Sequence, residues 1–87
     1  MNTVDIDFYL DSLPIDIEEI DVSYKKINYL PNLSKFTKLK RLYCNHNELY
    51  SLPDLNESLE FLSCCHNNLT LLPRLNTNLK KNRSHLI

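Results

Sequence analysis

The sequence contains no glycine, no tryptophan and no alanine. A collagen-like chain is excluded, because its triple helix needs glycine at every third position. A disordered chain is disfavoured as well, since 43% of the residues are hydrophobic and such a content favours burial in a core. The 87 residues suffice for one small domain, whose core gives only a thin margin of stability.

The sequence also lacks a long apolar run and an early positive charge. No stretch approaches the roughly 18 consecutive apolar residues that span a bilayer. Residues 1–22 contain no lysine or arginine, whereas a secretory signal begins with a basic region that precedes an apolar one. We therefore expect an intracellular protein that has no membrane segment.

Cysteine is scarce, and its positions do not fit a secreted framework. The three cysteines, Cys44, Cys64 and Cys65, are an odd number and lie within a short part of the chain. Small secreted domains use an even number of cysteines in several bridges. Reduced thiols in a reducing compartment are therefore the expectation.

Two neighbouring stretches, 39–58 and 59–78, repeat one pattern. A fixed period near twenty residues indicates a solenoid, whose units bury their apolar faces by stacking on one another. The matching positions are Leu39/Leu59, Leu42/Leu62, Cys44/Cys64, His46/His66, Asn47/Asn67, Leu49/Leu69, Leu52/Leu72, Pro53/Pro73, Leu55/Leu75 and Asn56/Asn76.

An earlier repeat precedes these two units. Residues 17–38 carry apolar residues and a proline at the matching positions, but the unit is two residues longer. It has Lys25 where the later units have asparagine. Near the extra length, Ser34 is a candidate cap for a short helical or 3-10 turn.

We expect residues 1–87 to form a single domain. The repeat pattern is less regular at both of its ends. Residues 1–16 form either an N-terminal cap or a partial repeat, and residues 79–87 form a truncated repeat. Near the start, apolar residues alternate with polar ones, which predicts a half-buried strand. These apolar residues are Val4, Ile6, Phe8 and Leu10.

The spacing within one unit predicts its geometry. Leu42 and Cys44 are two residues apart and point to one side of a short strand, while Arg41 and Tyr43 point to the other. Pro53 prevents a long helix in the segment that returns to the next strand. Strands that recur in one direction form a parallel sheet. We expect mostly extended or 3-10 return segments and little helix.

The spacing of one unit also carries a family resemblance. Residues 39–49 spell L-x-x-L-x-C-x-x-N-x-L, and residues 59–69 spell it again. With this motif the chain resembles leucine-rich repeat proteins. The short unit with LPDL and LPRL is similar to bacterial-type leucine-rich repeats, and the composition resembles uncharacterised leucine-rich repeat proteins of giant DNA viruses.

The resemblance implies a fold and a function. The fold is a leucine-rich repeat solenoid of the α/β horseshoe class, with a short parallel sheet on its concave face. The function is non-enzymatic binding of a protein partner, of unknown identity, through that face. The alternative is a truncated fragment of a longer leucine-rich repeat array or effector, with no independent activity.

Two asparagines are expected to be structural. Asn47 and Asn67 follow the predicted strands, where the backbone turns away and loses its ladder partners. An inward amide has both donors and an acceptor for such groups, in its own unit and in the adjacent one. Lys25 cannot accept a hydrogen bond, so we expect the first repeat to be looser.

The concave face follows from the alternation along each strand. Exposed aromatic and arginine side chains are typical of interaction hot spots, although simple cross-strand packing also explains aromatic pairs in a sheet. We expect Tyr43 and Phe61 to form one apolar patch beside Arg41. The predicted partner-binding residues are Arg41, Tyr43, Asn45, Phe61, Ser63 and Cys65.

A metal site or an active site is not expected. The cysteines and histidines of the two units offer zinc-ligand side chains, but the repeat geometry sends them to the core, the concave face and the turn, whereas zinc needs four converging ligands. A short sheet offers no deep pocket for catalysis. We predict no cofactor, no metal and no catalytic residue.

The charges are unequal along the chain. Residues 1–22 hold seven acids and no base, and the remainder holds ten bases and four acids. One end of a solenoid would then be acidic and the other basic, which predicts weak head-to-tail self-association. A basic cluster is formed in the sequence by Arg74, Lys80, Lys81 and Arg83. It has no recognised nucleic-acid motif beside it, so nucleic acid is not an expected partner.

Overall fold

In the part of the chain that the structure describes, the protein folds into one short helix and a parallel sheet. The computed structural model describes residues 5–70 and, for residues 81–84, the backbone. The elements of this part of the chain are α1 (Ile6–Asp11), β1 (Glu19–Asp21), β2 (Arg41–Tyr43), β3 (Phe61–Cys64) and β4 (Lys81–Ser84). The prediction of a short parallel sheet with little helix is confirmed. Within the described ranges, no helix is long and apolar enough to cross a membrane.

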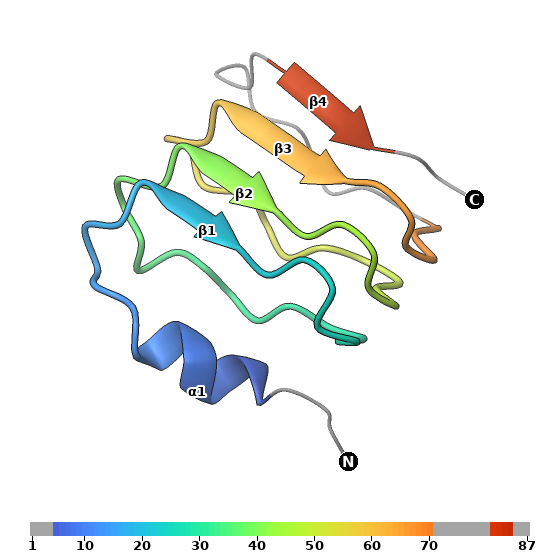
Figure 1. Cartoon of the computed structure of the whole chain (residues 1–87). Helices are drawn as coiled ribbons and strands as arrows, with labels where there is room; N and C mark the ends of the chain where they lie inside the picture. Colours follow the sequence, from blue (N-terminus) through green and yellow to red (C-terminus); the bar gives the residue numbers. More distant parts are fainter. Residues whose placement is uncertain (1–4, 71–80, 85–87) are drawn as a thin grey trace.

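The strands lie side by side in sequence order, β1-β2-β3-β4 (Figure 1). Glu19 pairs with Arg41, Arg41 with Phe61, and Phe61 with Lys81. Paired residues are thus 22, 20 and 20 positions apart, which are the steps between the sequence repeats. The spacing in the sequence therefore sets the register of the sheet.

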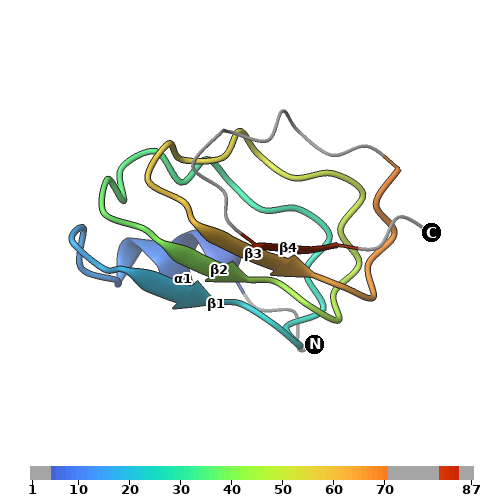
Figure 2. The same ribbon diagram turned by 90° about the horizontal axis from the view of Figure 1, so that it is seen from above.

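Between strands the chain runs back behind the sheet (Figure 2). Residues 22–40 and 44–60 contain turns and bends but no helix or strand, and no 3-10 helix either. Pro31 and Pro53 lie in these return segments, and proline is compatible with extended backbone. The return segments and the sheet form two layers with the core between them.

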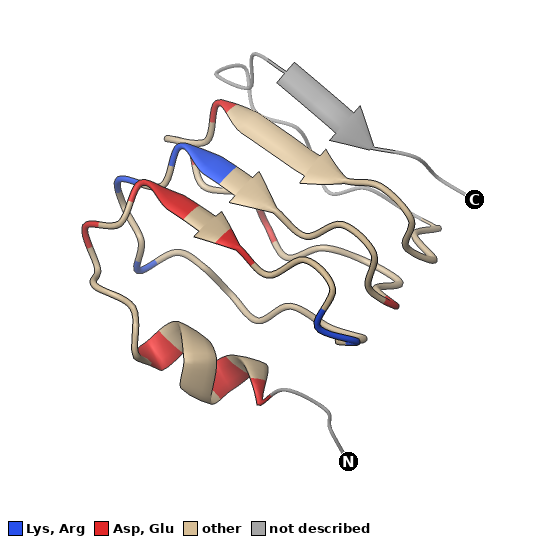
Figure 3. Ribbon diagram, in the orientation of Figure 1, with Lys and Arg blue, Asp and Glu red and all other residues tan. Residues whose placement is uncertain are grey.

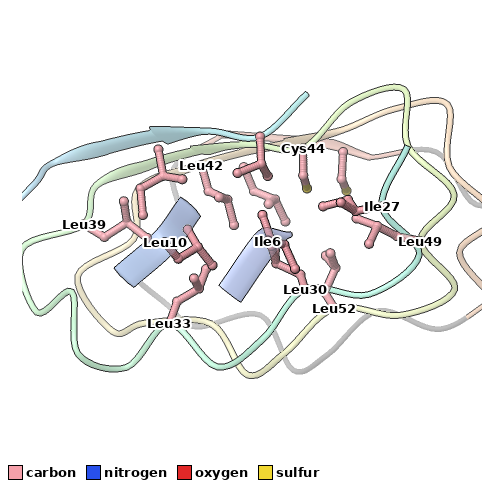
Figure 4. Close-up of a cluster of buried hydrophobic side chains, with 14 of the residues drawn as sticks. Ile6, Leu10, Ile27, Leu30, Leu33, Leu39, Leu42, Cys44, Leu49 and Leu52 are labelled. Carbon is pink, nitrogen blue, oxygen red and sulfur yellow. The ribbon is translucent and has the colours of Figure 1, made fainter. Parts of the chain in front are cut away.

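The inner face of the sheet carries the repeated apolar residues. Ile20, Leu42 and Leu62 are 1%, 0% and 0% exposed, at the centre of β1, β2 and β3. Figure 4 shows Leu42 and Cys44 on the sheet side of the core, opposite Leu33 and Leu52 from the return segments. Each fully buried leucine stabilises the fold by about 1.5–3 kcal/mol, so stacking of these rows is the main source of stability.

The two additional residues of the first return segment accommodate a phenylalanine. Phe36 is fully buried. Its N–H donates to Leu33 O (3.0 Å), and its carbonyl accepts from Leu39 N (3.1 Å) in a second turn. A turn was predicted here with Ser34 as its cap, but Asn32 is the residue whose Oδ1 accepts from Ser34 N (2.6 Å). The inserted residues thus place a large ring in the core.

The prediction of a strand near the N-terminus is wrong, because residues 6–11 form α1. Ile6 and Leu10 are buried, whereas Phe8 is 73% exposed. A spacing of four residues places two side chains on one face of either a strand or a helix, but the residue midway lies on the opposite face only in a helix. Asp5 Oδ1 accepts from Phe8 N (3.1 Å) and caps the helix. Val4 lies outside the described residues.

Polar contacts hold α1 against the first return segment. Lys35 Nζ donates to Asp11 Oδ1 (2.7 Å), and the Tyr29 hydroxyl donates to Asp7 Oδ2. The Asp7 carboxylate, which accepts this hydrogen bond, raises the pKa of Tyr29. Lys25 Nζ lies 5.0 Å from the centre of the Tyr9 ring. These contacts join α1 to the first return segment, while Ile6 and Leu10 of the helix belong to the hydrophobic core.

Candidate interaction surface of the sheet

The outer face of the sheet carries the residues that alternate with the buried ones. The strand register arranges them in two rows across the sheet. From β1 to β3 these rows are Glu19, Arg41 and Phe61, and Asp21, Tyr43 and Ser63; in the backbone register, Lys81 and Arg83 hold the next positions on β4. The positions are acidic on β1, include two aromatic residues on β2 and β3, and are basic on β4.

Tyr43 and Phe61 lie in contact at the centre of this face. Their ring centroids are 5.3 Å apart, and the ring planes are tilted by 51°. Both residues are half-buried, so each ring keeps a surface in contact with solvent. A tilted aromatic pair at this distance contributes about 0.5–1.5 kcal/mol beyond the area that it buries. The two rings form the single apolar patch that the sequence predicted.

Arg41 is held beside this patch by an acid of the neighbouring strand. Arg41 Nε donates to Glu19 Oε1 at 2.8 Å, and the two side chains are 43% and 50% exposed. The Glu19 carboxylate raises the pKa of the Arg41 guanidinium further above its usual value. Phe61 is the register partner of Arg41 on the other side. The guanidinium is thus oriented before any partner binds.

The predicted contacts Asn45, Ser63 and Cys65 lie together at the ends of the strands. Asn45 Oδ1 accepts from Ser63 Oγ (2.9 Å) and from Cys65 N (2.7 Å). Asn45 N donates to Ser23 Oγ (3.0 Å) on the other side. Ser63 is only 7% exposed, so it is a cross-strand link rather than the exposed contact that was expected. Asn45 and Cys65 remain half-buried.

Asn47 and Asn67 form the hydrogen bonds expected of inward amides. Both are buried, at 8% and 5% exposure. Asn47 Oδ1 accepts from Lys25 N (2.9 Å) and Ile27 N (3.2 Å), and its Nδ2 donates to Val22 O (2.9 Å). Asn67 acts on the preceding repeat in the same way, because its Oδ1 accepts from Leu49 N (3.1 Å) and its Nδ2 donates to Cys44 O (2.9 Å).

The turn after β1 has Lys25 in place of asparagine, but its backbone groups still have hydrogen-bond partners. Each asparagine bonds the turn of the repeat before its own, so Asn47 supplies the acceptor for Lys25 N. The prediction of a looser first repeat considered only the side chain of Lys25, which cannot accept a hydrogen bond. The backbone of its turn is held instead by an amide that lies 22 positions later in the chain.

A row of stacked rings follows the strands, and sequence reasoning missed it. Tyr24, His46 and His66 have positive φ angles of 61°, 56° and 60°. The ring of His46 lies 4.4 Å from that of Tyr24 and 4.2 Å from that of His66, with interplanar angles of 10° and 15°. The repeated histidine was a signal, but the left-handed backbone that aligns the rings has no signature in a chain without glycine.

The cysteines occupy different environments. Cys44 and Cys64 are fully buried, as expected, and Cys65 is half-buried. Contact with the Cys64 thiol, together with burial, raises the pKa of the Cys44 thiol. Among the described residues, no group of three or more His, Cys, Asp or Glu side chains is arranged to hold a metal ion.

A shallow groove lies on the side of the return segments, away from the sheet face. Its volume is about 430 Å³, and all of its lining residues except Leu55 have polar or charged side chains. Asn56 Nδ2 donates to Leu33 O (3.0 Å) and Phe36 O (2.8 Å) at its base. No residue predicted to bind a partner lines it. The lining residues are Asn32, Ser34, Thr37, Asp54, Leu55, Asn56, Glu57 and Ser58.

Comparisons of the chain with protein-family models, with curated proteins and with solved structures give no significant match. Functional inference therefore depends on the residues and contacts of this chain.

Proposed function

We propose that the chain is a leucine-rich repeat module that binds a protein partner through the outer face of its sheet. The steps of 22, 20 and 20 residues between paired strands support this class, as do the amides of Asn47 and Asn67, which link adjacent repeats. In this proposal the repeats form a solenoid, and the outer face is its concave surface. The module is not an enzyme and acts inside the cell.

The observation that carries the binding role is the contact between Tyr43 and Phe61. From β1 to β3 the inward positions remain apolar because stacking requires it, but the outward positions change from strand to strand. Arg41 is replaced by Phe61, and Tyr43 by Ser63, one repeat later. A half-exposed aromatic pair beside an arginine has the composition of an interaction hot spot.

Each residue has a distinct role in the proposed interface. Tyr43 and Phe61 accept an apolar side chain of the partner, and Arg41 binds a carboxylate or a backbone carbonyl next to it. Asn45 and Cys65 contact the partner at the rim. Ser63 supports the face by its hydrogen bond to Asn45. The partner is therefore a protein with an exposed apolar residue near an acidic one.

The test is loss of binding when the two rings are removed. A partner is first isolated with the wild-type chain from its native host, and affinities are then measured with the purified partner. The variant Y43S/F61S should weaken Kd about 30-fold or more for each ring that acts as a hot spot of about 2 kcal/mol. Far-UV circular dichroism checks that the fold is retained.

A matched control removes one phenylalanine and one tyrosine from other surfaces. Phe8 and Tyr50 are 73% and 60% exposed and lie outside the strands. The variant F8S/Y50S should bind the partner as the wild type does. Unchanged binding by folded Y43S/F61S, or an equal loss in both variants, would show that the outer face of the sheet is not the binding surface.

A further inference from the structure

Of the strands that the structure describes, the two outermost, β1 and β4, have residues of opposite charge. Among the described strands, β1 pairs only with β2, and β4 pairs only with β3. An edge strand has backbone N–H and C=O groups on one side that another strand can use. Figure 2 shows α1 behind β1, on the side of the return segments, where Ile6 and Leu10 join the core.

The hydrogen bonds of β1 define which residues face its outer edge. Arg41 N donates to Glu18 O (3.0 Å), and Val22 N donates to Tyr43 O (2.8 Å). Successive residues of a parallel strand direct their backbone groups to opposite neighbours. Because Glu18 and Val22 face β2, the backbone groups of Glu19 and Asp21 face the outer edge.

The same alternation occurs at the next pair of strands. Phe61 N donates to Lys40 O (3.0 Å), and Cys44 N donates to Ser63 O (2.8 Å). Phe61 and Ser63 thus face the preceding strand, and they hold the register positions that Glu19 and Asp21 hold on β1. At the outer edge of β1, the backbone N–H and C=O groups therefore belong to the same register positions as those that β3 directs toward β2. A β1 strand can continue the sheet beyond β4 without a shift of register.

In that arrangement acids and bases become neighbours. Lys81 follows Phe61 in the first row of the sheet, and Arg83 follows Ser63 in the second. The next strand, if it were β1 of another copy, would place Glu19 opposite Lys81 and Asp21 opposite Arg83. Within the chain, Glu19 already pairs with a base on its other neighbour, since Arg41 Nε lies 2.8 Å from Glu19 Oε1. Adjacent positions of this row can therefore form an ion pair.

The charges extend beyond the edge strands. Figure 3 shows acidic residues on α1 and along β1, and residues 61–87 contain four bases and no acid. Pairing of two β1 strands, or of two β4 strands, would bring like charges together, which is destabilising. Only the combination of β1 with β4 is complementary in both backbone phase and charge.

We propose that copies of this chain associate head to tail, with β1 of one copy in parallel pairing with β4 of the next. Glu19 lies opposite Lys81, and Asp21 opposite Arg83. Each contact leaves one further β1 and one further β4 open, so the association does not close at two copies and grows with concentration. The contact involves outer positions of β1 and β4 but neither Tyr43 on β2 nor Phe61 on β3, so the proposal is independent of the proposed binding function.

Analytical ultracentrifugation of charge-exchanged variants tests the proposal. The wild-type sedimentation coefficient should rise with protein concentration at low ionic strength and fall when salt is added, because salt screens the ion pairs. E19K/D21K and K81E/R83E should each weaken association about tenfold or more. An equimolar mixture of the two variants should associate again, because the exchanged edges are complementary to each other.

The controls separate edge pairing from a change of net charge. E48K/D54K makes the same charge change as E19K/D21K at two exposed residues outside the strands, and it should not reproduce the loss. E19Q/D21N removes the charges but keeps acceptor oxygens for Arg41 Nε and Ser23 N, and it should weaken association. If a double variant does not fold, the mixture of D21K with R83E tests one pair and retains the Glu19–Arg41 bridge.

The possible results are decisive. A wild-type chain that stays monomeric at high concentration and low salt overturns the proposal. So does a mixture of folded variants that fails to regain association, or an assembly that stops at a closed dimer. Concentration-dependent growth that is lost in each variant and regained in the mixture supports it.

Discussion

The inner and outer faces of the sheet differ although the same short strands form both. From β1 to β3 the inner face repeats one chemistry, because each of these strands buries an apolar side chain in the core. Leu42 and Leu62 are paired neighbours, and both are fully buried. The outer face changes from Glu19 to Arg41 to Phe61 along one row. Stacking thus fixes the inner residues and does not constrain the outer residues in the same way.

The largest effect is expected on the inner face. Leu42→Ala should lower the free energy of unfolding by about 2–5 kcal/mol, because it leaves a cavity in a stacked row of the core. Tyr43→Ala changes the next residue of the same strand but faces outward, and it should cost clearly less. Urea denaturation of both variants measures the difference. Equal losses would mean that the two faces contribute alike to stability.

A smaller effect is expected where the strands turn. Asn47→Ala removes the amide that pairs with Ile27 N and Val22 O, and the loss of this one buried partner should lower the free energy of unfolding by about 1–3 kcal/mol. Faster amide hydrogen exchange at Ile27 should accompany the loss.

Lys25→Asn provides the comparison at the first repeat. The new asparagine would follow β1, and α1 rather than another strand and turn precedes this repeat. It would have no earlier turn to bond, so it should change stability by less than about 1 kcal/mol. A gain of stability as large as the loss in Asn47→Ala would contradict the view that each asparagine acts on the repeat before its own.

A pH dependence of stability is expected from the buried thiol of Cys44 on the inner face. The pKa of Cys44 is raised in the folded state, so the folded protein keeps a proton that the unfolded chain releases near pH 8.5. The stability from this group is full below that pH and falls above it, by at most about 1.4 kcal/mol per pH unit. Thermal denaturation of the wild type and of Cys44→Ala from pH 7 upwards isolates the contribution.

Alkylation compares the thiols of the two faces directly. A small alkylating reagent should modify Cys65 in the folded protein and should reach Cys44 and Cys64 only after unfolding, since these two are fully buried. Mass spectrometry after timed labelling, with and without denaturant, gives the number of modified thiols. Equal rates for all three would mean that the core opens readily.

The sequence by itself determined the spacing and the polarity of the strands. Repeats of 22 and 20 residues predict which residues pair, and alternation predicts that Leu42 and Cys44 face inward while Tyr43 faces outward. These features follow from local geometry and from the need to bury apolar side chains, which act in the same way in every repeat. The position of Asn47 as an inward amide was predictable for the same reason.

Only the tertiary structure decided the features that depend on neighbours from other repeats. The spacing of Ile6 and Leu10 is compatible with either a strand or a helix. In the folded chain they form one face of α1, which packs against the core. Ser63 is buried because Asn45 crosses from the adjacent strand to accept its hydroxyl. The ring of His46 stacks because equivalent residues of three repeats adopt a left-handed backbone together. Such contacts join residues about twenty positions apart, and local patterns carry no information about them.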